Sequence, residues 1–164
     1  MAVVHKQEVK DWICKSFDRN IKILDVGSGC GTYYNLLHDE FQTIDSVEVF
    51  EPNIVNYNLR DKYRVVFNCN ITDFKYNYYD LVIFGDVIEH LDVKEAQGVL
   101  TYALDHCRDM IVAVPYMYEQ DIVENNVYEI HKQPDLTVEN VIERYPYLEL
   151  LYGNDLYGYY IKRK

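Results

Sequence analysis

The sequence predicts a single α/β domain with a mainly parallel sheet, and three observations support this prediction. Short apolar runs rich in Val, Ile and Phe alternate along the chain with stretches of helical pattern. Such alternation is typical of right-handed βαβ units, in which a helix connects two parallel strands. The 164 residues, of which 49% are hydrophobic, suffice for one domain with a sizeable core. Finally, three glycines at alternate positions follow the first apolar run.

Five apolar runs are expected to form the buried strands of the parallel part of the sheet. They are bounded by turn residues, as strands covered on both faces usually are. These runs are residues 21–26, 47–50, 64–67, 80–84 and 110–114. Two further runs, residues 148–152 and 157–161, surround a Gly-Asn-Asp turn and predict a hairpin. We therefore expect a seven-stranded sheet with an antiparallel C-terminal strand and helices on both faces.

Helical segments with recognisable end signals lie before and between these strands. Residues 3–17 predict a leading helix, whose apolar positions include Val4, Val9, Trp12, Ile13 and Phe17. A proline in the first turn favours a helix over residues 52–63. Asp92, with a glutamate three positions later, resembles a capping box for a helix that ends near residue 107. Thr137 can cap a further helix over residues 138–144.

The formal net charge of −11 argues against a nucleic-acid partner. Nucleic-acid binding depends mainly on the attraction of Lys and Arg side chains to phosphates. The basic cluster at residues 162–164 is expected to be a solvated end of the chain. We therefore predict no nucleic-acid partner.

The cysteines are scattered along the sequence and do not form a CxxC zinc or redox motif. They are Cys14, Cys30, Cys69 and Cys107. We expect them to be reduced thiols, as is usual in the cytoplasm. The first ten residues lack an apolar stretch of signal-peptide length, and no segment is long enough to cross a bilayer. The sequence therefore predicts a cytoplasmic protein that does not insert into membranes.

The glycine-rich turn is the first candidate for a ligand site. Gly27, Gly29 and Gly31 follow the first strand, where a strand-to-helix turn needs backbone angles that favour glycine. Without a Cβ the main chain can also approach a ligand closely. A phosphate-binding P-loop would need a Gly-Lys-Ser or Gly-Lys-Thr triplet, which the chain lacks. The nicotinamide fingerprint GxGxxG would place the third glycine one position later.

The remaining pattern, an acidic residue followed by three alternate glycines, resembles motif I of the class I S-adenosylmethionine (SAM)-dependent methyltransferases. This family has a Rossmann-like fold with a mainly parallel seven-stranded sheet. The resemblance implies that Asp25 helps to hold the ammonium group of the methionine moiety. It also implies that the turn passes under the amino-acid and ribose parts of the cofactor. The residues of this turn are Gly27, Ser28, Gly29 and Gly31.

Two further positions fit the cofactor sites of this family. Glu48 ends the second predicted strand about 20 residues after the turn, where a carboxylate can accept both ribose hydroxyls. Glu51 is a rival, but it lies beside Pro52, where a helix start also favours an acidic residue. The position after the third strand carries Asn70 and Ile71, which the resemblance assigns to adenine. Relatives usually have Asp in place of Asn70, and Asp73 is the alternative acceptor.

Residues 79–91 resemble the "D-L-V … E/D-V-I-E-H-L" segment of small-molecule methyltransferases, which include the ubiquinone-biosynthesis O-methyltransferases. The strand end in these relatives lines the methionine part of the cofactor. In this chain it consists of Phe84, Gly85 and Asp86. The resemblance covers residues 21–114 and divides the single domain of residues 1–164 into a leading helix (1–20), a cofactor-binding half (21–114) and a substrate side (115–164).

Two histidines are candidates for the catalytic step. Methyl transfer benefits from a base when the acceptor begins as a protonated hydroxyl or amine, and histidine titrates near neutral pH. His90 follows the strand that should carry the methionine part of SAM, and His131 lies in the irregular segment 116–134. We expect Tyr33 and Tyr116 beside them. A purely structural role for His90 remains the alternative.

A metal-bound variant of this site is a second alternative. Asp86, Glu89, His90 and His131 resemble the Glu-x-x-Glu-His motif and distant His that bind metal in small-RNA 3′-end 2′-O-methyltransferases, with Asp in place of the first Glu. The preferred prediction contains no metal ligand, because the same motif occurs in metal-free relatives and the acidic charge disfavours RNA.

The sequence thus predicts a SAM-dependent methyltransferase for a small-molecule acceptor that it does not identify. The alternative from another class is a cofactor-binding subunit without catalysis. The chain is short for this family, so a partner protein or a second copy in a homodimer is expected to complete the site in that case.

Overall fold

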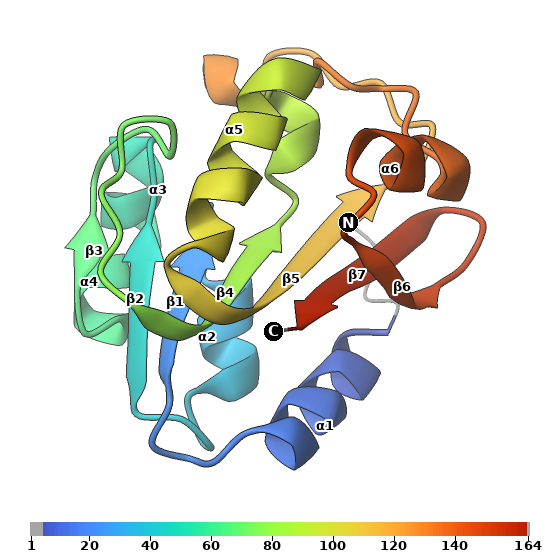
Figure 1. Cartoon of the computed structure of the whole chain (residues 1–164). Helices are drawn as coiled ribbons and strands as arrows, with labels where there is room; N and C mark the ends of the chain where they lie inside the picture. The colour runs from blue at the N-terminus through green and yellow to red at the C-terminus, as the bar shows by residue number, and fades with distance from the viewer. Residues whose placement is uncertain (1–4, 164) are drawn as a thin grey trace.

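A seven-stranded sheet forms the centre of the computed structural model, which describes residues 5–163 (Figure 1). Its spatial order is β3-β2-β1-β4-β5-β7-β6. The first five strands are parallel, and β7 runs antiparallel to both β5 and β6. The strands are β1 (Lys22–Val26), β2 (Thr43–Val47), β3 (Val66–Phe67), β4 (Tyr79–Gly85), β5 (Cys107–Pro115), β6 (Glu149–Gly153) and β7 (Tyr157–Arg163). The predicted α/β fold, with its antiparallel C-terminal hairpin, is confirmed.

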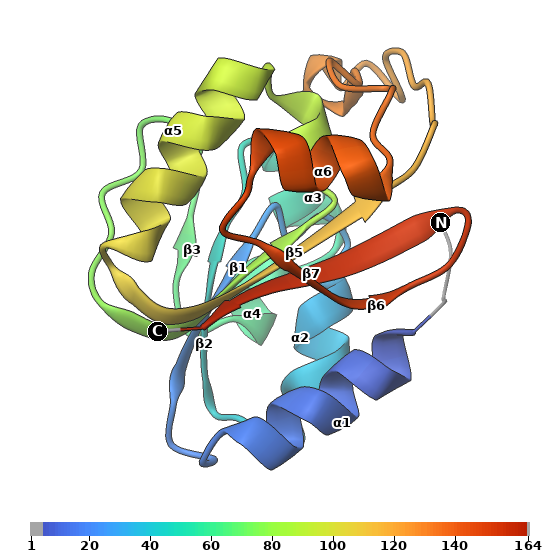
Figure 2. The same cartoon turned by 45° about the vertical axis from the view of Figure 1, so that its right-hand side comes forward.

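Helices cover both faces of this sheet, as Figure 2 shows. The helices are α1 (Lys6–Ser16), α2 (Thr32–Leu37), α3 (Glu51–Asn56), α4 (Leu59–Lys62), α5 (Val93–Leu104) and α6 (Val138–Arg144), with short 3-10 helices η1 (Ile88–His90) and η2 (Val127–Glu129). Alternate side chains of the central strands point to opposite faces. They pack with α5 and α6 on one face and with α1 to α4 on the other.

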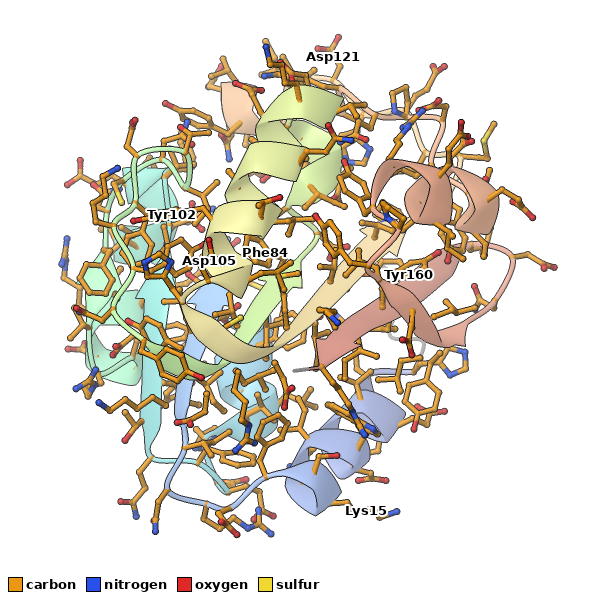
Figure 3. The ribbon with its side chains drawn as sticks, viewed as in Figure 1. Lys15, Phe84, Tyr102, Asp105, Asp121 and Tyr160 are labelled. Carbon is orange, nitrogen blue, oxygen red and sulfur yellow. The ribbon has the colours of Figure 1, made fainter. Side chains whose placement is uncertain are left out.

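Two interior side chains illustrate how the sheet joins its covering helices (Figure 3). Phe84 of β4 and Tyr160 of β7 are fully buried in the core that includes α5 and α6. Lys15 and Asp121 lie at the periphery of the molecule. Burial of large side chains on both faces supplies the main favourable contribution to folding.

The predicted helix caps are confirmed at two sites. The Asp92 side chain accepts a hydrogen bond from the Glu95 backbone N–H, and the Glu95 carboxylate accepts one from the Asp92 N–H, which completes the capping box of α5. Thr137 accepts from the backbone of Asn140 and caps α6 over the predicted residues 138–144. Helix α5 ends earlier than predicted, because residue 107 already belongs to β5.

The second strand corrects the prediction of a strand over residues 47–50. β2 begins at Thr43 and ends at Val47. The strand was missed because Asp45 and Ser46 interrupt the apolar pattern although both are buried. The Asp45 carboxylate compensates for its burial by accepting hydrogen bonds from the Arg64 guanidinium and the Tyr79 hydroxyl, at 2.6 and 2.9 Å.

The helix predicted over residues 52–63 is broken into α3 and α4. Asn58 adopts a left-handed conformation with φ of 51°, which an α-helix cannot continue through. The proline expected in the first turn is present there. The predicted strand over residues 64–67 is also shorter, because only Val66 and Phe67 pair with β2.

The C-terminal strand β7 contacts the leading helix α1. The described part of the predicted leading helix starts at Lys6, and Val4 lies outside the described residues. Arg163, a member of the basic cluster, belongs to β7 and is exposed, and its guanidinium lies over the Trp12 ring at 4.8 Å. Within residues 5–163, no helix is long and apolar enough to span a membrane.

Candidate functional site

Two cavities lie beyond the carboxyl ends of the parallel strands, where ligands of open α/β sheets usually bind. Their volumes are about 500 and 340 Å³. We call them the larger and the smaller cavity. They meet at a junction bordered by five residues that line both of them. These residues are Gly27, Gly29, Asp86, His90 and Glu129.

The glycine turn forms the shared floor of the two cavities. Gly27 has a φ of 68° and donates its backbone N–H to the Val47 carbonyl at 2.8 Å, so the turn is tied to the end of β2. A Cβ at this position would lie 2.6 Å from a methyl carbon of Val87. Both the conformation and the space therefore require glycine here.

The smaller cavity contains the predicted ribose and adenine residues. Glu48 is 4% exposed, and its carboxylate accepts hydrogen bonds from the backbone N–H groups of Gly29 and Phe50, both at 2.8 Å. Burial raises the pKa of Glu48, although these two hydrogen bonds oppose the rise. Asn70 and Ile71 border the same cavity.

The two rival acidic residues do not border either cavity. Glu51 lies in the first turn of α3, where the helix N-terminus favours an acidic side chain. Asp73 donates its backbone N–H to the Asn70 carbonyl but does not reach the lining. Glu48 and Asn70 therefore border a cavity that their rivals do not reach, and their roles in binding ribose and adenine stay predictions.

Asp25, Gly31 and Phe84 also do not border the cavities. Asp25 is fully buried, and one carboxylate oxygen accepts a hydrogen bond from the Tyr63 hydroxyl at 2.5 Å. The other oxygen has no partner among the described residues. Burial raises the pKa of Asp25 to about 7, although the Tyr63 hydrogen bond lowers it. The Asp25 side chain is therefore directed to Tyr63 rather than to either cavity.

The larger cavity begins at the end of β4. Gly85 lies directly against the Tyr33 ring. A Cβ at this position would lie 2.1 Å from a ring carbon, so a larger residue would displace the ring. Asp86 follows with a φ of 56°, and its carboxylate accepts a hydrogen bond from the Tyr157 hydroxyl of β7. Burial raises the pKa of Asp86, and the Tyr157 hydrogen bond opposes this effect.

The outer wall of the larger cavity is mostly apolar and aromatic. Tyr33 and Tyr116 line it, as do both predicted catalytic histidines. The other apolar and aromatic lining residues are Pro115, Met117, Tyr118, Leu156 and Tyr157. Cavities that bind small organic molecules typically combine such walls with a few convergent polar groups.

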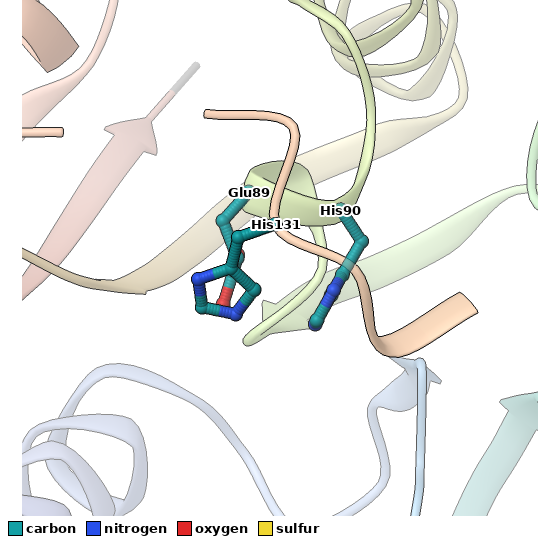
Figure 4. A group of neighbouring side chains, drawn as sticks. All are labelled: Glu89, His90 and His131. Carbon is teal, nitrogen blue, oxygen red and sulfur yellow. The ribbon is translucent and has the colours of Figure 1, made fainter. Parts of the chain in front are cut away.

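The side chains of Glu89, His90 and His131, which all line the larger cavity, lie close together (Figure 4). Each offers a ligand atom, and these atoms lie within 4.8 Å of one another. The Nδ1 atom of His90 lies 3.3 Å from the Ile130 carbonyl, and that of His131 lies 2.7 Å from the Tyr118 carbonyl. Since a carbonyl only accepts, each Nδ1 carries the proton and each Nε2 keeps a lone pair.

Burial shifts the pKa values of two members of this cluster, Glu89 and His90. Glu89 is 1% exposed, and neither carboxylate oxygen has a hydrogen-bond partner among the described residues. Burial, followed by the Asp86 charge, raises the pKa of Glu89 well above its usual value. Burial and then His131 lower the pKa of His90 to about 4, so its ring is neutral at pH 7. Asp86 stands outside this cluster, so three of the four residues in the alternative metal set come together.

The 116–134 loop is anchored by a buried residue that sequence reasoning missed. Gln133 is 2% exposed and donates to the carbonyls of Ile88 and Leu91, at 2.7 and 3.0 Å, which fixes the loop to η1. The backbone N–H groups of Lys132 and Gln133 both donate to the Glu89 carbonyl. An irregular loop has no periodicity to reveal such contacts, and polar residues are common in any loop.

Comparisons with known proteins bear on the fold. No protein-family model matches the sequence, and no curated protein matches it. Solved structures do match. The methyltransferase domain of bacterial CtHen1 is 19% identical and superposes with a TM-score of 0.71 over 98% of both chains. A SAM-dependent methyltransferase from Clostridium acetobutylicum is 13% identical, with a TM-score of 0.70 over 97% of this chain and 91% of the other.

The chain has the class I methyltransferase fold. A further neighbour, the magnesium protoporphyrin IX methyltransferase from Synechocystis, was solved with bound SAM. It is 12% identical and has a TM-score of 0.68 over 98% of this chain and 81% of its own. The predicted Rossmann-like sheet with helices on both faces is thereby confirmed.

Proposed function

We propose that the chain is a SAM-dependent methyltransferase that acts on a small-molecule acceptor. The observation that carries this proposal is the pair of cavities that meet at the glycine turn. The smaller one presents Glu48, Asn70 and Ile71 to an adenosine group, and the larger one presents the end of β4 to a methionine group. The class I methyltransferase fold and the SAM-bound neighbour support the choice of cofactor.

The remaining space of the larger cavity is proposed to bind the acceptor. SAM carries its own leaving group, so the protein mainly aligns the acceptor with the methyl group and removes a proton where necessary. His131 borders only the larger cavity and presents a free Nε2, which makes it the better placed base for the acceptor. His90 borders both cavities and contacts the junction.

A cytoplasmic location completes the proposal. The four cysteines are free thiols, which is typical of proteins that work in a reducing compartment.

Isothermal titration with SAM and with its demethylated product S-adenosylhomocysteine (SAH) tests the cofactor assignment. We expect one binding site, with ATP and NAD as nucleotide controls that do not bind. A protein that binds neither SAM nor SAH at millimolar concentration would end the proposal. Formation of SAH from SAM in the presence of a panel of phenols, amines and carboxylates as methyl acceptors then separates a catalyst from a non-catalytic subunit. His131→Asn should abolish this formation of SAH while it leaves SAM affinity within about twofold.

Metal-dependent methyl transfer to a hydroxyl is the second candidate, and the cluster of Glu89, His90 and His131 favours it. An unpaired buried carboxylate beside two Nε2 lone pairs suits a divalent cation such as Mn²⁺. Carbonyl contacts to both Nδ1 atoms fix the ring orientations, as hydrogen bonds to the second ring nitrogen do for metal-binding histidines. A cation bound there would lower the pKa of an acceptor hydroxyl.

Thermal unfolding with Mn²⁺, Mg²⁺ or chelator tests this second candidate. We expect millimolar Mn²⁺ to raise the melting temperature of the wild type but not that of Glu89→Gln. Glu119→Gln serves as the matched control, because Glu119 is exposed on the same loop and borders neither cavity. An equal effect of Mn²⁺ on all three proteins, or no effect on the wild type, would exclude the metal.

A further inference from the structure

A carboxylate of the 116–134 loop lies at the junction of the two cavities. Glu129 ends η2 and is one of the residues that line both cavities. One carboxylate oxygen accepts a hydrogen bond from Gln120 Nε2 at 2.9 Å, and the other accepts one from Asn126 Nδ2 at 3.2 Å. Asn126 is itself 5% exposed. Two neutral amides thus fix the orientation of the carboxylate without neutralising its charge.

The surroundings of Glu129 leave this negative charge uncompensated. The ion pairs found among residues 5–163 do not include Glu129. Its charge contributes to the raised pKa values of both Glu48 and Glu89, although burial is the largest cause for each. Glu48 lines only the smaller cavity and Glu89 only the larger one, whereas Glu129 lines both, so its carboxylate lies where the cavities meet and can attract a cationic group there.

We propose that Glu129 faces the sulfonium of SAM and makes the site prefer this charged cofactor to its neutral product SAH. The inference rests on the proposed function and assigns a new residue to it. Adenosine in the smaller cavity and methionine in the larger one place the sulfur, which joins them, at the junction. SAM and SAH share every other group, so a charge at this point distinguishes the two molecules.

This preference has a direct consequence for turnover. The attraction between Glu129 and the cofactor disappears when the methyl group leaves, because the sulfur becomes a neutral thioether. The fixed amides of Gln120 and Asn126 prevent the carboxylate from turning away to relieve its own desolvation. Product release is therefore favoured by the same charge that favours cofactor binding.

Titration calorimetry of SAM and SAH, with EDTA present to remove any metal contribution, tests the inference. The full-length wild type is compared with Glu129→Gln, which keeps the shape of the side chain, and with Glu119→Gln as control. We expect Glu129→Gln to weaken SAM binding about tenfold, equivalent to about 1.4 kcal/mol, and SAH binding less than twofold. Glu119→Gln should leave both affinities unchanged.

Other outcomes would overturn the inference. If Glu129→Gln weakens SAM and SAH equally, Glu129 binds a group that both share or only supports the loop. If it changes neither, the carboxylate does not contact the cofactor. A wild type that binds neither molecule rejects the proposed function itself.

A second measurement uses only the wild type, so its result cannot be due to a variant that fails to fold. Sinefungin carries an ammonium group in place of the sulfonium, so the wild type should bind sinefungin and SAM more tightly than SAH. A wild type that binds SAH at least as tightly as both cations would contradict the inference.

Discussion

Glu48 and Glu51 lie three positions apart, yet only Glu48 borders a cavity. The difference arises because the chain leaves β2 at Val47 and enters α3 at Glu51. Glu48 therefore stands at the carboxyl end of a parallel strand, and Glu51 stands on a helix. The assignment of Glu48 to the ribose remains a prediction that a pair of matched variants can test.

Glu48→Gln should weaken SAM and SAH binding by the same factor, about tenfold or more. A carboxylate that accepts two hydroxyl groups loses charge-assisted hydrogen bonds when it becomes an amide. Glu51→Gln, which removes the same charge from a neighbouring position, should change both affinities less than twofold. Titration calorimetry measures all four values. Equal effects of the two variants would show that Glu48 does not bind the ribose.

Asp25 should make stability depend on pH. Its pKa is raised from 3.8 to about 7 in the folded protein, so the folded state binds this proton more tightly than the unfolded state. The resulting stability is fully present below about pH 4 and is lost as the pH rises through about 7. Between pH 5 and 8 the wild type should lose about 2 kcal/mol more than Asp25→Asn, which cannot ionise.

Urea denaturation at pH 5 and 8 measures this difference. Burial also raises the pKa values of Glu48, Asp86 and Glu89, but these groups are present in both proteins and cancel in the comparison. Parallel pH profiles for wild type and variant would show that Asp25 does not titrate in this range.

Sequence reasoning found the residues that a strand end or a glycine turn fixes in place. Gly27, Glu48 and Asp86 could be named because each follows a strand of the parallel sheet. Glu129 and Gln133 could not, because their partners belong to the same irregular loop or lie more than ten positions away. Tertiary contacts of this kind leave no local pattern.

At the scale of elements, the 116–134 loop depends on one side chain. Gln133 uses its amide N–H groups on two carbonyls around η1, while its amide oxygen accepts from Arg144 and Tyr145 of the α6 region. It therefore links the loop, η1 and α6. Removal of the amide deletes all four of these hydrogen bonds, although Arg144 keeps its contact to Asp135 and the Ile88 carbonyl keeps the Leu91 N–H.

Gln133→Ala should lower the free energy of unfolding by about 2–3 kcal/mol and should speed proteolysis of the loop. Gln97→Ala is the control, because the exposed Gln97 makes one hydrogen bond to the Arg144 carbonyl. Gln97→Ala should lower the free energy of unfolding by only about 0.5 kcal/mol. Urea denaturation and limited trypsin digestion supply the measurements. A Gln133 variant as stable as the control would show that the loop is held mainly by its backbone.

The elements themselves were predictable to different degrees. Helix α6 and the capping box of α5 follow local rules, and their prediction is confirmed. Strand β2 was misplaced because its buried Asp45 is compatible with a strand only through the distant Arg64 and Tyr79. The break at Asn58 was missed because asparagine can adopt a left-handed conformation, but its presence in a sequence does not by itself indicate one.

For the whole molecule, the order of the strands was the least accessible feature. Alternating strands and helices predict a parallel sheet, and the hairpin predicts an antiparallel end. The sequence carried no separate signal that β7 would enter the sheet between β5 and β6, yet this placement brings Tyr157 to Asp86 at the cavity.

Cofactor binding should stabilise the whole fold by mass action. SAM at 100 times its dissociation constant is expected to raise the free energy of unfolding by about 2.7 kcal/mol, because the unfolded chain lacks both cavities. Urea denaturation with and without SAM measures this gain, and ATP at the same concentration is the control. An unchanged midpoint with SAM would contradict the proposed cofactor.

The two edge strands of the sheet, β3 and β6, affect whether molecules of this protein can associate by strand pairing. β3 offers only the two residues Val66 and Phe67 for pairing, and β6 shifts its register between Leu150 and Tyr152 behind the exposed Glu149. One edge strand is short, and the other is irregular and charged. Both are poor templates for pairing with a strand from a neighbouring molecule. We therefore expect little edge-to-edge pairing between molecules in concentrated solutions.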